Sequence, residues 1–277
     1  MSRYMIACDM AVVHPRDALV ALADREGDVA EGALWIAAED TSGLDVARWL
    51  ERIDELAGEL RTQCGIDGCR PGDAPLVAPL LRSRLGLRGA GGGDPRAHYL
   101  HSVLERGAGV PIACSAIWIA VGTRASIPIE GVNTPGHFLV RVGDLLYDTI
   151  AGGEPLDAED TRRLVERSTG WEAPRVEPAW LARATTRDIL ARMSRNLRGC
   201  YSCLENWPLA LRAADRCVDL LPGDPAERRD RGVLLWRLGQ TRAALDDLRW
   251  YLERVPDDAA DRGDIEEIAS RLRAFMN

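Results

Sequence analysis

The segment PGHFLVRVGDLLYD, residues 135–148, decides the fold because it predicts a β-hairpin whose register can be counted. Two alternating apolar runs are separated by Gly143-Asp144, a two-residue connection typical of tight hairpin turns. This turn pairs Leu139 with Asp148, and alternate residues of a strand share a face. His137 and Asp148 are therefore diagonal neighbours on one face. The backbones of diagonal neighbours lie about 7–8 Å apart, which is close enough for the side-chain carboxylate of one to contact the imidazole of the other.

The residues before the hairpin predict the core that it packs against. Pro111 stands where the first residue of a helix is expected, and residues 112–123 are apolar on almost every side. These features predict a helix that runs through the core. Packed against the hairpin and a strand in residues 127–132, this helix gives an α+β fold with a small antiparallel sheet.

Helical patterns flank this core on both sides. On the N-terminal side, apolar residues at intervals of three and four predict helices, one of them capped by Asp45. On the C-terminal side, the pattern of strands stops after Gly153. From Asp188 onward the chain is predicted to be helical. We divide it into an N-terminal helical region (1–88), a core (89–180) and C-terminal helical repeats (181–277).

The C-terminal region contains an internal repeat. Ala210 and Ala244 are 34 residues apart, as are Leu211 and Leu245, and this period is typical of tetratricopeptide helix pairs. We expect all four side chains to be buried at helix contacts. The charged segment 224–231 is predicted to be a solvated face of the repeat, although concave repeat surfaces also bind peptides.

Composition excludes several classes of partner. The chain of 277 residues is 46% hydrophobic, has a formal net charge of −8 and contains no lysine. This balance argues against nucleic acid and anionic membrane surfaces, and the absence of lysine excludes a catalytic lysine. No apolar run approaches the length of a membrane span, and the N-terminus carries no targeting pattern. With seven cysteines, an odd number, we expect reduced thiols and a cytoplasmic location.

Several motifs resemble the transglutaminase-like proteins of the bacterial SirB family, over roughly residues 30–277. They are ALWIAAED from residue 33, LDVARWL from 44, YLxxVLER from 99, GVPI from 109, PIEGVN from 128, PGHFLVR from 135 and DRG from 230. The resemblance implies a papain-like transglutaminase core followed by tetratricopeptide repeats.

The resemblance also implies roles for individual residues. Active transglutaminase-like enzymes have a cysteine at the start of the core helix, a histidine on a following strand and an aspartate on the next. His137 and Asp148 match the last two positions, whereas the cysteine position falls on Pro111. This departure puts catalysis in doubt, because proline offers no nucleophile.

Cys114 is the candidate that could replace the missing nucleophile. It lies three residues after Pro111, on nearly the same helix face, and a helix N-terminus favours thiolate. The alternative is that Cys114 is a small apolar residue packed in the core. Ser115 is a weaker candidate that could instead bond to backbone inside the core.

Other polar residues complete the candidate site. His98 and His101 share a helix face and could extend the histidine cluster, and with Ser115 and Asn133 they are our candidates for substrate binding. We expect no metal and no cofactor, since no third ligand stands at a convincing spacing. One alternative stays open, a four-thiolate zinc site that combines the pairs Cys64/Cys69 and Cys200/Cys203.

Two functions follow from this sequence. The first is a cysteine-dependent acyl transferase or amide hydrolase in which Cys114 attacks a carbonyl, His137 moves the proton and Asp148 orients the imidazole. Its substrate would be a small molecule, a peptide or a protein. The second is a catalytically inactive pseudo-enzyme that binds a peptide or protein partner through its cleft and helical repeats.

Overall fold

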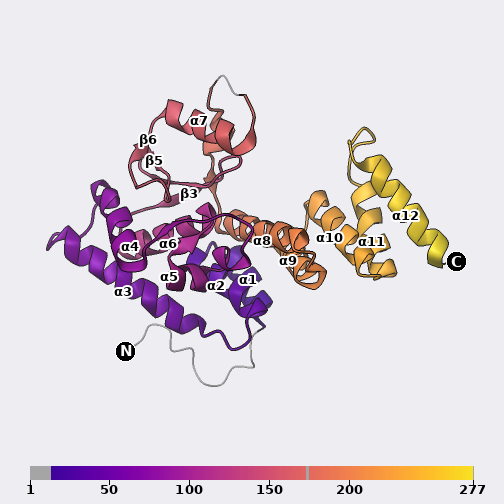
Figure 1. Cartoon of the computed structure of the whole chain (residues 1–277), viewed down its shortest axis with the longest axis horizontal. Coiled ribbons are helices and arrows are strands. Elements are labelled where there is room, and N and C mark those ends of the chain that lie inside the picture. The colour runs from indigo at the N-terminus through magenta and orange to yellow at the C-terminus, as the bar shows by residue number, and fades with distance from the viewer. Residues whose placement is uncertain (1–13, 173–174, 277) are drawn as a thin grey trace. The chain divides into compact units, whose positions relative to one another are not determined.

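The computed structural model describes residues 14–172 and 175–276 (Figure 1). The chain forms two units, Met1–Met193 and Ser194–Asn277, with the boundary inside helix α8 (Thr186–Cys203). The division into three parts, with boundaries after residues 88 and 180, stays a prediction. Within the described ranges, no helix has both the length and the apolar character needed to span a bilayer.

Helices form most of the first unit, as the sequence predicts. They are α1 (Pro15–Asp24), α2 (Val29–Asp40), α3 (Val46–Cys64), η1 (Pro71–Leu76), α4 (Val77–Leu85), η2 (Pro95–Ala97), α5 (Leu100–Arg106), α6 (Pro111–Arg124), α7 (Ala158–Thr169) and η3 (Pro178–Leu181). Asp45 accepts a hydrogen bond from the Arg48 backbone N–H and caps α3, which confirms the expected start.

Helix α6 is the centre of this unit. It begins at Pro111, and its residues from Ile112 to Gly122 are all buried. It packs against α2, α3, α4 and α5 and against strands β3 and β4, so it has no solvent-facing side over most of its length. The prediction of a core helix from all-round apolar character is confirmed.

The sheet has five short antiparallel strands in the order β6-β5-β4-β3-β7. They are β3 (Glu130–Val132), β4 (Leu139–Val142), β5 (Leu145–Tyr147), β6 (Pro155–Leu156) and β7 (Arg183–Ala184); a separate parallel pair joins β1 (Arg88–Gly89) to β2 (Ala108–Gly109). The counted hairpin register is confirmed, since Val142 pairs with Leu145 and Val140 with Tyr147. Gly143 turns the chain at φ 58°.

The expectation that no strand follows Gly153 is wrong. Strands β6 and β7 follow it and form both edges of the sheet. Each contains two residues, which is too short to leave an alternating pattern in the sequence.

The second unit is entirely helical in its described residues. After α8 it contains α9 (Trp207–Leu220), α10 (Pro225–Arg237), α11 (Thr241–Leu252) and α12 (Arg262–Met276), and consecutive helices from α9 onward pack together. Ala210 and Ala244 are fully buried and Leu245 is 4% exposed, as the repeat predicts. Leu211 is only half-buried, at the margin of the core cluster.

The charged segment 224–231 is not the solvated face that we expected. Glu227 is 2% exposed and pairs with Arg195 and Arg198 on α8. Burial alone would raise the pKa of Glu227, but the two guanidiniums outweigh it and hold that pKa below its usual value. The sequence pattern did not reveal this because the partners come from a helix some 30 residues earlier.

We predict that Ala244→Leu lowers the free energy of unfolding by about 1–3 kcal/mol, because a larger side chain overpacks a position that is fully buried in the helix contact. Ala243→Leu is the matched control, since Ala243 is exposed on the same helix. Urea unfolding of both variants measures the difference. Equal stability of the two would contradict the packing described for α11.

Candidate functional site

His137 and Asp148 meet at the open end of the hairpin. His137 Nε2 lies 3.1 Å from Asp148 Oδ1, and both side chains are less than a tenth exposed. The predicted proximity is therefore confirmed. The two atoms are in contact, but their geometry is not that of an aligned hydrogen bond. His137 Nε2 has no hydrogen-bond partner among the described residues. Asp148 Oδ1 also accepts the Ile150 N–H at 3.1 Å, which fixes the carboxylate in the turn.

Cys114 lies in the first turn of α6 but is completely buried. Its thiol donates to the carbonyl of Gly109 at 3.5 Å and to that of Arg88 at 3.8 Å, so the β1–β2 pair lies over the sulfur. Burial raises the pKa of Cys114 to about 12, and the negative charge of Asp148 adds to this rise. A neutral thiol that already donates to backbone is a weak nucleophile.

Ser115 is also fully buried and forms a hydrogen bond with the Thr149 hydroxyl at 3.1 Å. This bond joins α6 to the end of the hairpin, directly after Asp148. Ser115 is therefore a polar group satisfied inside the core, although its partner is a side-chain hydroxyl rather than the backbone group that we expected.

His98 and His101 lie in separate environments. His98 Nε2 contacts the Gly92 carbonyl at 2.9 Å, whereas the His101 ring lies between Trp49 and Tyr99, with ring centroids 6.0 and 5.9 Å away. Burial lowers the pKa of both imidazoles, which favours their neutral forms. Their role in substrate binding stays a prediction.

Arg192 is the residue near the site that sequence reasoning missed. Its guanidinium donates to the His137 carbonyl at 2.9 Å, to the Thr134 carbonyl at 3.0 Å and to the Asn133 side-chain oxygen. Arg192 therefore holds the chain that enters β4, and Asn133 serves as one of its acceptors. No local pattern marks Arg192, because His137 lies 55 residues earlier.

The four-thiolate zinc alternative is wrong. Cys64 and Cys69 form a disulfide with each other, so the expectation of reduced thiols also fails for this pair. Within the part of the chain that the structure describes, no group of three or more His, Cys, Asp or Glu side chains is placed to hold a metal ion.

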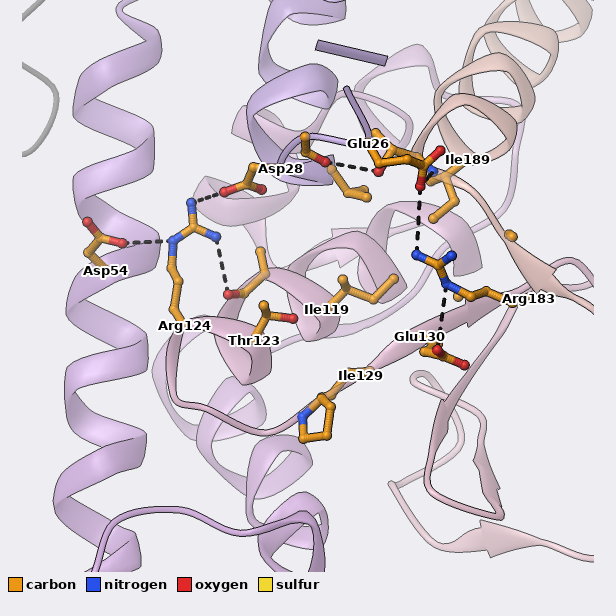
Figure 2. Close-up of a pocket in the computed structure, with 17 residues that line it drawn as sticks. Glu26, Asp28, Asp54, Ile119, Thr123, Arg124, Ile129, Glu130, Arg183 and Ile189 are labelled. Carbon is orange, nitrogen blue, oxygen red and sulfur yellow. Dashed lines mark hydrogen bonds and ion pairs between the residues drawn. The ribbon is translucent and has the colours of Figure 1, made fainter. Parts of the chain in front are cut away.

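The first unit contains a cavity of about 630 Å³ that the sequence did not reveal (Figure 2). Its charged lining consists of two guanidiniums and four carboxylates: Arg124, Arg183, Glu26, Asp28, Asp54 and Glu130. None of the sequence-predicted site residues lines it. The lining comes from six separate segments, the α1–α2 turn, α3, α6, the start of β3, β7 and α8, so no local motif marks it.

Comparisons with known proteins agree with the two units. Residues 47–195 match the Transglutaminase-like superfamily and residues 197–273 match the Tetratricopeptide repeat. A UPF0162 protein of Xylella fastidiosa is 38% identical over 232 residues, which cover 81% of this chain and 83% of that protein. Protein SirB1 of Salmonella typhimurium is 26% identical over 191 residues, 65% of each chain. The solved structure of menin aligns with a TM-score of 0.47 and 12% identity, covering 95% of this chain and 71% of menin.

We predict that iodoacetamide near neutral pH labels the exposed Cys203 and leaves Cys114 unlabelled in the folded protein. Reactivity follows access and thiolate fraction, and burial reduces both for Cys114, so labelling of Cys203 is expected to be much faster. Cys217 is the matched control, since burial also raises its pKa to about 12. Mass mapping of labelled peptides measures this, and faster labelling of Cys114 than of Cys203 would contradict it.

Proposed function

Because the chain belongs to the transglutaminase-like superfamily, together with the bacterial SirB1 and UPF0162 proteins, we propose that it is a catalytically silent member that binds a peptide segment of a partner protein. The binding surface lies in its tetratricopeptide unit. The observation that carries the proposal is the state of Cys114, which is buried, neutral and bonded to backbone.

The place of the missing nucleophile supports a silent core. Pro111 occupies the first position of α6, where the superfamily's enzymes have cysteine, and the Cys114 thiol three residues later is covered by β1 and β2. The His137–Asp148 contact then ties the strand end to the turn after β5. A pair of this kind stabilises the fold without a reaction to catalyse.

A small cavity in the second unit supports the binding role. It encloses about 320 Å³ and is lined by Arg198, Gly199, Ser202, Trp207, Asp230, Val233, Leu234 and Arg237. The Arg237 guanidinium lies 4.7 Å from the centre of the Trp207 ring. Tryptophan and arginine are the residues most enriched among binding hot spots, and this volume suits one or two anchoring side chains.

Charge indicates what kind of peptide this cavity accepts. Two arginines and one aspartate line it, in a chain whose net charge is −8. Arg198 is paired with Glu227 and Asp230, so Arg237 carries the positive charge that the cavity offers to a ligand. This favours a peptide that places a carboxylate beside Arg237 and an apolar side chain against Trp207.

Peptides that bind the full chain can be selected from a random displayed library. We predict that their affinity for the chain falls about tenfold or more when Trp207→Ala or Arg237→Ala is introduced. Arg254→Ala is the matched control, because Arg254 forms a comparable contact with Trp250, 4.0 Å from its ring centre, and does not line the cavity. Calorimetry measures the dissociation constants, and thermal melts show whether each variant folds. Unchanged affinity in both cavity variants, or failure to select any peptide, would contradict the proposal.

A second candidate function is acyl transfer or amide hydrolysis by Cys114, His137 and Asp148, with a small-molecule, peptide or protein substrate. The 3.1 Å contact of the imidazole with the carboxylate favours it. This function requires β1 and β2 to move off the sulfur before the thiol can lose its proton to His137. Preferential labelling of Cys114 over Cys203 would support this function and contradict the silent core.

A further inference from the structure

The cavity of the first unit has two charged ends of different character (Figure 2). At one end Arg124 donates to Asp54 at 2.8 Å and to the Ala120 carbonyl at 3.2 Å, and it pairs with Asp28. Its side chain is only 16% exposed. This end is an ion-pair network whose arginine is already fully engaged.

The other end is loosely paired. Arg183 lies between Glu26 and Glu130, 3.7 and 3.6 Å from their carboxylate oxygens, beyond hydrogen-bond distance. All three side chains are between two and three fifths exposed. Exposed ion pairs contribute little to the stability of a fold. Another cation can therefore replace Arg183 between the two carboxylates with little loss of free energy.

The Glu26 end is nevertheless held in place. The Thr186 backbone N–H donates to the Glu26 carboxylate at 3.2 Å, and the Thr186 hydroxyl donates to the Gly27 carbonyl at 2.9 Å. These bonds join the α1–α2 turn to the start of α8. The carboxylate is therefore positioned before any ligand arrives, which reduces the entropy lost on binding.

Apolar side chains lie between the two ends. Ile119, Ile129 and Ile189 line the cavity and are each less than a tenth exposed, and Figure 2 shows Ile119 between the two arginines. A cavity of about 630 Å³ is in the range of small-molecule sites. The isoleucines offer a surface for an alkyl chain rather than for a second polar group.

We propose that this cavity binds a small alkylguanidine, with its guanidinium between Glu26 and Glu130 and its alkyl chain along the isoleucines. Four carboxylates against two guanidiniums leave the lining with two excess negative charges, so a cation is favoured and an anion excluded. The planar guanidinium is favoured because that group already lies between these two carboxylates, as part of Arg183.

The test uses agmatine, an alkylguanidine with a terminal amine, titrated into the full chain in a calorimeter up to about 1 mM. We expect one site per chain. Free arginine should bind more weakly, because its carboxylate faces a negatively charged lining. Magnesium chloride at equal concentration should fail to compete, since it has no alkyl chain and no planar donors.

Three variants separate specific binding from attraction to an acidic protein. Glu130→Gln should weaken agmatine binding about tenfold, through loss of a charged hydrogen bond. Arg183→Gln should strengthen it, because the competing cation is removed. Glu55→Gln should leave it unchanged, since Glu55 is exposed on α3 and does not line the cavity.

Opposite changes in Glu130→Gln and Arg183→Gln cannot come from a general loss of folding, and melting temperatures confirm that each variant is folded. No agmatine binding, equal binding by wild type and Glu130→Gln, or full competition by magnesium would each overturn the proposal. This outcome is independent of Trp207, so it leaves the proposed peptide binding untouched.

Discussion

Helix α6 is enclosed by α2, α3, α4 and α5 and by strands β3 and β4, so its residues from Ile112 to Gly122 are buried. This burial organises the first unit and decides the chemistry of its cysteine. The Cys114 thiol is buried, and among the residues that the structure describes the charge that acts on it is the negative one of Asp148, which disfavours a thiolate. Both of its hydrogen bonds also need the proton. Burial outweighs the favourable electrostatics of a helix N-terminus.

The described structure keeps apart the open space and the three residues, Cys114, His137 and Asp148, that cysteine-dependent acyl transfer would use. His137 and Asp148 are in contact, but the Cys114 thiol is covered by the backbone of β1 and β2. Open space lies elsewhere in the first unit, where carboxylates and isoleucines line the larger cavity, and within the repeats, where Trp207 and Arg237 line the smaller one. Each of these surfaces suits recognition by charge and shape.

Features set by residues close together in the sequence were predicted correctly. Contacts between residues far apart in the sequence were missed. A two-residue turn fixed the hairpin register and the approach of His137 to Asp148. The Arg88 carbonyl that covers Cys114 is 26 residues away from it, and Arg192 is 55 residues from its acceptor at His137. Neither contact has a periodic signature. The carboxylates of the larger cavity were unrecognised for the same reason, because they meet only after folding.

The central claim is that Cys114 is a buried, neutral thiol, and its titration tests this claim most directly. The Cys114 Cβ chemical shift, followed by NMR with carbon-13-labelled cysteine, reports the charge of the sulfur as pH rises from about 6 to about 10. With a pKa of about 12, this signal should stay constant over that range. An inflection at or below about 8.5, the value of a free cysteine, would show an accessible or activated thiolate and contradict the account.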